Sequence, residues 1–303
     1  MKFLKYLLFI ALGNFAMNSA LADFHSVGWT NVFLPGGGQL IRGENLDAAK
    51  EATLETSTFL LGYSLSPHGS FSLDGTSIDY DNHKSAAKPL SSALFQEFGL
   101  KLHLMNTFLV YRDQNKIESA DQGQGIDQRS SREMFKDPFR LEVLKSPWVY
   151  LPIIMSGAYV LIDYHSMDNQ NKKPIDKLNP GSKAYLATIQ LGVYPFGSAA
   201  PEETFYRGFV QNEFYYLVRS PYFSIPMSSL VFALSHQQSD WSGAFASGLY
   251  QGMLAYKNNG NLAFGNAVHF WGVVILGIEA YVLTLKRQNS HQPVALNFSF
   301  MFQ

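Results

Sequence analysis

The sequence contains no cysteine and few charged residues. The absence of cysteine excludes disulfide bonds, thiolate zinc sites and a cysteine nucleophile. Charged residues make up 16% of the 303 positions, whereas soluble domains average about 25%. The chain also lacks an excess of either sign, because 23 basic and 24 acidic residues give a formal net charge of −1. Binding to nucleic acid requires a clear excess of Lys and Arg, so we expect no nucleic-acid partner.

The charged residues are distributed unevenly along the chain. Residues 111–145 contain 14 charged side chains, whereas the 102 residues from 184 to 285 contain only eight. The mean hydropathy of −0.05 is therefore an average over polar loops and apolar segments. A value near zero is compatible with a membrane protein that has long loops.

Uncharged runs dominate the second half of the chain. They cover residues 146–162, 184–201, 220–235, 241–256 and 261–278. Each run has 16 to 18 residues, close to the roughly 17 to 25 that a helix needs to cross a bilayer. Helical patterns also occur at 44–65 and 89–111. The sequence therefore predicts an all-α fold, a polytopic transmembrane bundle of about six helices with polar loops.

The N-terminus has the features of an export signal. Two lysines precede the apolar residues 6–17, and small residues follow at positions 20 and 22, where signal peptidase recognises them. We expect residues 1–22 to form a signal peptide that is cleaved before Asp23. The alternative is a first membrane helix that stays attached, and in both cases we expect the bacterial inner membrane as the location.

The remaining chain divides into three segments. Residues 23–145 combine N-terminal helices with a polar, charged linker, residues 146–285 form an apolar domain, and residues 286–303 form a tail that is compatible with a short strand. Near the start of the first segment lies the turn-rich sequence Leu34-Pro35-Gly36-Gly37-Gly38. Because proline and glycine disfavour a helix interior, we expect no helix there.

Ionisable residues are rare within the apolar segments, and five of them form three groups. Glu202, Glu203 and Arg207 are the first group, His236 is the second and His269 is the third. A charge at bilayer depth costs at least a few kcal/mol and normally faces a partner or a cavity. In a helix, Glu203 and Arg207 lie on one face and can pair, whereas Glu202 points about 100° away.

Each group also has a purely structural interpretation. Two glutamates at a helix start interact favourably with the helix dipole, and a single histidine in an apolar segment is more often a structural residue than a catalyst. The occurrence of all three groups within 68 residues favours a common function. A carboxylate and an imidazole can hold and deprotonate one water molecule, and a second histidine can bind a metal or donate to a developing oxyanion.

The three groups resemble the three motifs of the CAAX-protease and bacteriocin-processing family of intramembrane proteases: Glu202-Glu203-x-x-x-Arg207, Phe232-x-x-x-His236 and His269. The resemblance covers about residues 147–285, under half of the chain. It implies that Glu202 and His236 position and activate the attacking water. It further implies that Arg207 anchors Glu203 and that His269 polarises the scissile carbonyl or completes a metal site.

The resemblance does not decide whether the site contains a metal ion. Glu202, His236 and His269 would suit zinc, yet a glutamate and two histidines need no metal to act as base and donor. The third motif of the family usually continues with Asn or Asp four residues after its histidine, where this sequence has Val273. Loss of one oxyanion donor costs about a hundredfold or more in rate. The activity is therefore weakened or lost, unless another group such as Asn266 supplies the missing hydrogen bond.

Three functions follow as alternatives. The first is an intramembrane endopeptidase that acts on a peptide or protein substrate, with or without a lipid anchor. The second, favoured by Val273, is a catalytically degenerate membrane protein that binds or protects a partner, as immunity-type members do. The third is an exported envelope protein in which the apolar segments form an ordinary core.

Overall fold

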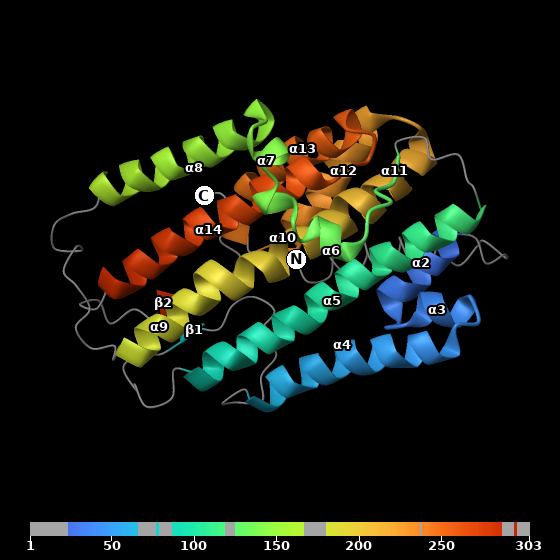
Figure 1. Ribbon diagram of the computed structural model, residues 1–303, viewed down its shortest axis with the longest axis horizontal. Helices are drawn as coiled ribbons and strands as arrows, with labels where there is room; N and C mark the ends of the chain where they lie inside the picture. Colours follow the sequence, from blue (N-terminus) through green and yellow to red (C-terminus); the bar gives the residue numbers. More distant parts are fainter. Residues whose placement is uncertain are drawn as a thin grey trace. The chain divides into compact units, whose positions relative to one another are not determined.

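The computed structural model describes residues 24–65, 77–78, 87–118, 125–166, 180–236, 238–286 and 294–295, and these are almost entirely helical (Figure 1). The expected all-α fold is therefore confirmed for the described part of the chain. The predicted signal peptide, residues 1–22, lies outside the described residues.

The first part of the chain forms helices where the periodicity predicts them. The predicted helices at 44–65 and 89–111 are α4 and α5, and α5 is longer than expected. Their bounds, and those of the neighbouring short elements, are α2 (Phe24–Phe33), α3 (Gly37–Ile41), α4 (Asn45–Leu65), β1 (Ser77–Ile78) and α5 (Ala87–Glu118).

Five further helical regions correspond to the uncharged runs. They are α8 (Pro147–Ser166), the continuous helical stretch from α9 (Pro180–Thr188) through η3 (Ile189–Val193), α10 (Tyr194–Glu203) and η4 (Thr204–Val210) to α11 (Gln211–Val218), then α12 (Pro221–Leu234), α13 (Trp241–Lys257) and α14 (Ala263–Lys286). Both η3 and η4 are π-helical. Inserted π-helical turns often occur at functional sites.

The sequence predicts that these helices cross a membrane, but their length and composition do not meet the requirements for a membrane span. Within the described ranges, no helix is both long enough and apolar enough to cross a membrane. The uncharged runs of 16 to 18 residues lie at the lower limit of a span, and proline, glycine and polar residues within them reduce their apolar character.

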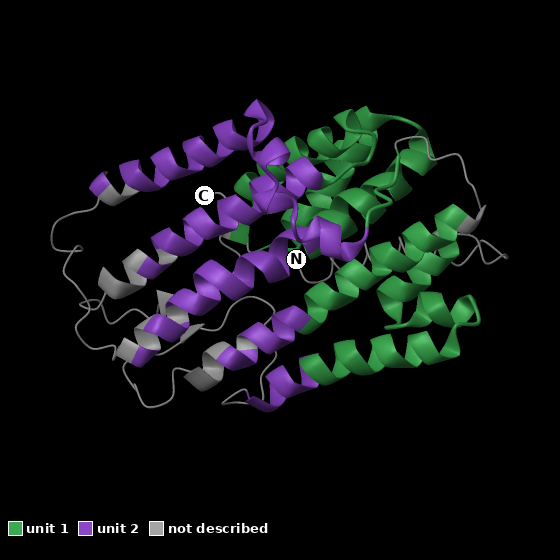
Figure 2. Cartoon of the chain, viewed as in Figure 1, with its two compact units in different colours: residues 1–58, 99–129, 201–262 green, residues 59–98, 130–200, 263–303 purple. Residues whose placement is uncertain are grey.

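The chain forms two compact units, each built from three stretches of sequence (Figure 2). Unit 1 contains residues 1–58, 99–129 and 201–262, and unit 2 contains residues 59–98, 130–200 and 263–303. In unit 1, α12 packs along α13, and α11 and η4 pack on α12. In unit 2, α14 is the central helix and packs on α8, η1 and η3.

The core of unit 1 depends on close packing of glycine against aromatic rings. Phe108, Tyr111 and Phe209 are fully buried, and the rings of Tyr111 and Phe209 meet edge to face at 5.0 Å. A Cβ at Gly208 would lie 2.4 Å from the ring of Phe108. Glycine therefore brings the first functional motif close to α5.

The segment predicted to be a polar, charged linker contains short helical elements. Residues 111–118 continue α5, and residues after 130 form the short elements α6 (Ser131–Met134), η1 (Asp137–Phe139) and α7 (Leu141–Leu144). Asp127 and Asp137 are buried, at 4% and 0% exposed. These two buried carboxylates pair with arginines of the same segment, Asp127 with Arg129 and Asp137 with Arg140.

The glycine-rich turn at residues 34–38 and the short strand in the tail were both predicted, and only the strand agrees fully with the structure. The turn ends at Gly36, whose φ of 75° places it in the left-handed region, but Gly37 and Gly38 lie inside α3. Glycine is needed at position 38 because a Cβ there would lie 2.7 Å from a methyl carbon of Val110, so the two glycines serve close packing and the backbone remains helical. In the tail, β2 (Val294–Ala295) forms the expected short strand and pairs antiparallel with β1 in unit 2.

Candidate active site

The first motif lies in unit 1, where α10 passes into the π-helical segment η4. Glu202 and Glu203 end α10, and Arg207 lies within η4. Their exposed fractions are 3%, 0% and 1%. Three buried ionisable groups in six residues require nearby partners, because an unpaired buried charge is costly.

Arg207 is the centre of these interactions. Its Nε lies 3.5 Å from Oε2 of Glu203, which is an ion pair between residues four apart, as predicted. Its Nη2 donates a hydrogen bond of 2.6 Å to Oε1 of Gln251 on α13. Its guanidinium carbon also lies 4.5 Å from the centre of the Phe232 ring, a distance that gives a favourable cation–π interaction.

The second motif lies at the C-terminal end of α12, also in unit 1. Nδ1 of His236 donates a hydrogen bond of 2.7 Å to the backbone carbonyl of Phe232, one helical turn earlier. In the neutral imidazole, a proton on Nδ1 puts the lone pair on Nε2. Phe232 therefore fixes the tautomer of His236, which is the one able to accept a proton at Nε2.

Glu202 interacts with residues outside the three predicted groups. Its Oε1 accepts a hydrogen bond from Nζ of Lys101 on α5, within unit 1. Tyr206 follows Glu202 by one helical turn, and its hydroxyl forms a hydrogen bond with Ser235, the neighbour of His236. Burial, and then the negative charge of Glu202, raise the pKa of Tyr206, although the hydrogen bond to Ser235 opposes the shift.

These contacts bring the first and second motifs together in one unit. The sequence offered a weak signal for Tyr206, which lies inside the first motif. It offered none for Lys101, which is about a hundred residues away from Glu202 in the chain.

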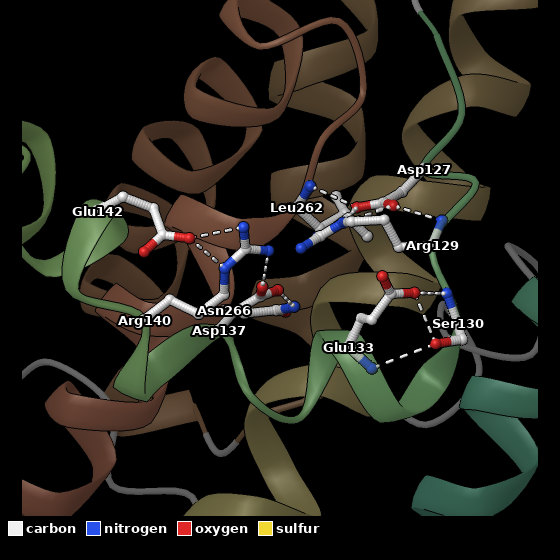
Figure 3. A network of polar contacts seen from close by, with 9 residues as sticks. All are labelled: Asp127, Arg129, Ser130, Glu133, Asp137, Arg140, Glu142, Leu262 and Asn266. Atoms are coloured by element: carbon white, nitrogen blue, oxygen red, sulfur yellow. Dashed lines mark hydrogen bonds and ion pairs between the residues drawn. The ribbon is translucent and has the colours of Figure 1, made fainter.

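The third motif belongs to unit 2. His269 lies on α14 and is 1% exposed, and Val273, one turn later, is 3% exposed. Asn266, the alternative oxyanion donor, uses its Nδ2 to donate a hydrogen bond of 2.9 Å to Oδ2 of Asp137, as Figure 3 shows. In the described structure Asn266 therefore holds η1 against α14.

The first turns of α14 are fixed to η1 by further contacts within unit 2. Nε1 of Trp271 donates a hydrogen bond of 2.8 Å to the carbonyl of Pro138. The ring of Phe139 packs edge to face on Phe270 at 5.2 Å. His269 lies between the anchored residues Asn266 and Phe270, so its backbone is held firmly.

A second polar cluster, in unit 1, involves the residue just before α14. Asp127 accepts hydrogen bonds from the backbone N–H of Leu262, at 2.8 Å, and from the side chain of Arg129, at 2.6 Å (Figure 3). Burial raises the pKa of Asp127, but the hydrogen bonds and the charge of Arg129 outweigh burial and lower it. Asp127 is therefore an ionised structural residue.

A zinc site has little support in the described residues. They contain no group of three or more His, Asp or Glu side chains that could hold one metal ion. Within unit 1, Oε1 of Glu202 already accepts a hydrogen bond from the ammonium of Lys101, a cation that competes with a metal for that oxygen. The donor set of unit 1 therefore does not fit zinc.

A family match covers the segment of the chain that carries all three motifs. Residues 184–275 match the Rce1-like family. The description of this family is type II CAAX prenyl endopeptidase Rce1-like. The match confirms the resemblance to CAAX proteases and includes Glu202, His236 and His269.

The Rce1-like match covers less than a third of the chain and leaves out Lys101 and all of α5. No curated protein and no solved structure matches the chain. The Rce1-like segment therefore identifies an endopeptidase-type family at a general level, and the roles of individual residues rest on the geometry described above.

Proposed function

We propose that this protein is an endopeptidase that cleaves peptide or protein substrates at a membrane, with Glu202 and His236 as the residues that activate water. The observation that carries the proposal is the contact between the first two motifs in unit 1. Arg207 lies over the ring of Phe232, and the carbonyl of Phe232 fixes the tautomer of His236. A shared site requires this kind of linkage between a carboxylate-bearing and an imidazole-bearing segment.

The reaction uses one water molecule. Glu202 accepts one of its protons, and Nε2 of His236 accepts a hydrogen bond from its other hydrogen. As the O–H bond to the proton breaks, the water oxygen adds to the carbonyl carbon, and the electron pair of the C=O bond moves to the carbonyl oxygen. The carbonyl then re-forms, the C–N bond breaks, and the proton on Glu202 passes to the leaving amine nitrogen.

His269 belongs to unit 2, and we propose for it the role of hydrogen-bond donor that the resemblance to the CAAX-protease family implies. A neutral imidazole carries one N–H group and can therefore donate such a hydrogen bond. Val273 cannot donate the second hydrogen bond that an asparagine at this position would give. We therefore expect a slow enzyme.

Exposed apolar side chains support action at a membrane. On α8, six large apolar residues are between 50% and 70% exposed: Trp148, Leu151, Ile154, Met155, Leu161 and Ile162. Large exposed apolar surfaces are typical of contact with lipid or with another protein. We place α8 against the lipid of the bacterial inner membrane, to which the N-terminal residues 1–22 would direct the chain. The family description makes a prenylated peptide the first substrate to test.

The test uses the full chain in proteoliposomes and an internally quenched peptide that ends in a prenylated Cys-aliphatic-aliphatic-x sequence. We expect Glu202→Gln and His236→Ala to reduce the cleavage rate by about a hundredfold or more. Glu51→Gln, a change in unit 1 on α4, is the control and keeps the wild-type rate. Wild-type rates in both active-site variants would refute the proposal.

Val273 favours a second candidate function, that of a degenerate family member that binds a membrane partner. A buried aliphatic side chain stands where the motif carries an amide or carboxylate. If the wild-type protein is inactive but Val273→Asn cleaves the peptide, the chain has a protease site that has lost a donor. If both remain inactive while crosslinking captures a partner in the membrane, the second function is correct.

A further inference from the structure

An ammonium group from α5 lies in contact with the carboxylate proposed to act as the base. Nζ of Lys101 donates a hydrogen bond to Oε1 of Glu202, and both residues belong to unit 1. The side chain of Lys101 is 14% exposed and that of Glu202 is 3% exposed. This pair is thus largely removed from water, which makes it stronger than a surface ion pair.

The local charges explain why Glu202 needs this partner. Glu202 and Glu203 are adjacent and both buried, so their negative charges repel each other. The guanidinium of Arg207 forms the ion pair with Glu203. Lys101 supplies the second positive charge, and the two acids are then balanced by two bases.

The balance matters for catalysis because only an ionised carboxylate can take a proton from water. Burial favours the protonated, neutral form of a carboxyl group, and so does a neighbouring carboxylate. A nearby ammonium favours the ionised form. Without Lys101, Glu202 would tend to carry a proton and would donate a hydrogen bond where the reaction needs an acceptor.

We propose that Lys101 is a positioning residue of the active site, which keeps Glu202 ionised and directs its Oε1 away from the attacking water. The inference rests on the proposed function, since it assigns Lys101 a role in that same reaction. It adds a residue from outside the matched segment 184–275. The Rce1-like segment by itself is therefore an incomplete site, and α5 completes it.

The decisive measurement is the pH dependence of cleavage by Lys101 variants of the full chain, with the same prenylated peptide. In Lys101→Met, which keeps the length of the side chain without its charge, we expect a rate about ten- to a hundredfold lower near neutral pH. The acidic limb of the profile moves to higher pH, and the rate recovers as the pH rises. A purely structural role would lower the rate without moving this limb.

Two further variants provide the controls. Lys101→Arg keeps the charge and should leave the acidic limb near its wild-type position. Lys50→Met removes a lysine of unit 1 that pairs with Asp47 on the exposed face of α4, and it should change neither the rate nor the profile. A wild-type rate and an unmoved acidic limb in Lys101→Met would overturn the inference.

The outcomes separate this inference from the proposed function. If Glu202→Gln is inactive but Lys101→Met resembles the wild type, the function stands and the role of Lys101 is wrong. If neither the wild-type protein nor Val273→Asn cleaves, both are wrong. If Lys101→Met does not fold, the neutral variant Lys101→Gln takes its place, in which an acidic limb moved to higher pH supports the inference and a low rate with an unmoved limb contradicts it.

Discussion

Arg207 lies with its guanidinium carbon 4.5 Å from the centre of the ring of Phe232. The two residues come from η4 and α12, and the same Phe232 accepts the Nδ1 proton of His236 through its backbone carbonyl. This contact gives a physical reason for phenylalanine in the second motif. The ring packs on the cation of the first motif, and the spacing of four residues places the histidine over the carbonyl.

The first prediction concerns the buried charge of Arg207. Arg207→Met leaves Glu203 without its positive partner, and loss of one member of a buried ion pair costs about 3–5 kcal/mol. We expect the free energy of unfolding to fall by this amount, measured by chemical denaturation. Adding Glu203→Gln should recover a large part of the loss, because the remaining buried group is then neutral. Additive losses in the double variant would contradict the ion pair.

The second prediction concerns the glycine that follows the first motif. A Cβ at Gly208 would lie 2.4 and 2.5 Å from two ring carbons of the fully buried Phe108. Gly208→Ala should therefore lower the free energy of unfolding by about 1–3 kcal/mol, the usual cost of overpacking a core. Gly157→Ala is the matched control, because it also lies inside a helix and its Cβ would meet nothing within 4 Å.

The control change should be neutral or stabilising by about 0.5–1 kcal/mol, since alanine favours a helix more than glycine does. Thermal melting of both variants, in the same detergent, gives the comparison. Equal melting temperatures for the two variants would show that Phe108 has room to move.

The third prediction concerns His103, a partly buried histidine in unit 1 outside the site. Nδ1 of His103 lies 2.7 Å from a carboxylate oxygen of Glu55, and its Nε2 lies 3.1 Å from the carbonyl of Val32. Both partners accept hydrogen bonds, so both ring nitrogens must donate, and His103 is an imidazolium. Burial opposes this charge, but the hydrogen bond and the charge of Glu55 outweigh it and raise the pKa of His103.

A pKa that folding raises stabilises the protein most at low pH. The contribution of His103 is complete below about pH 6.5, the pKa in the unfolded chain, and is lost as the pH rises through the higher folded value. We expect the difference in unfolding free energy between the wild type and His103→Gln to shrink between pH 6 and pH 9. His165→Gln, a change of an exposed histidine on α8, should show no such trend, and a difference for His103 that grows with pH would contradict the assignment.

The sequence determined the helices and the motifs of this protein. Apolar periodicity located α4 and α5, because a helix that packs on its neighbours carries apolar residues at regular spacing, and an uncharged run located α8. The spacing of four between Glu203 and Arg207 predicted their ion pair, since this spacing is set by local helix geometry. The three motifs indicated the family that the match of residues 184–275 confirmed.

Only the tertiary structure decided which distant residues serve the site and which charges are buried. Lys101 meets Glu202, and Asp137 meets Asn266, from positions about a hundred or more residues away. Sequence patterns report local periodicity and average polarity, so a charged stretch such as residues 111–145 looks solvated even where its acids are buried. A charge becomes inexpensive to bury once the fold supplies its counter-ion, and that counter-ion is a property of the packing.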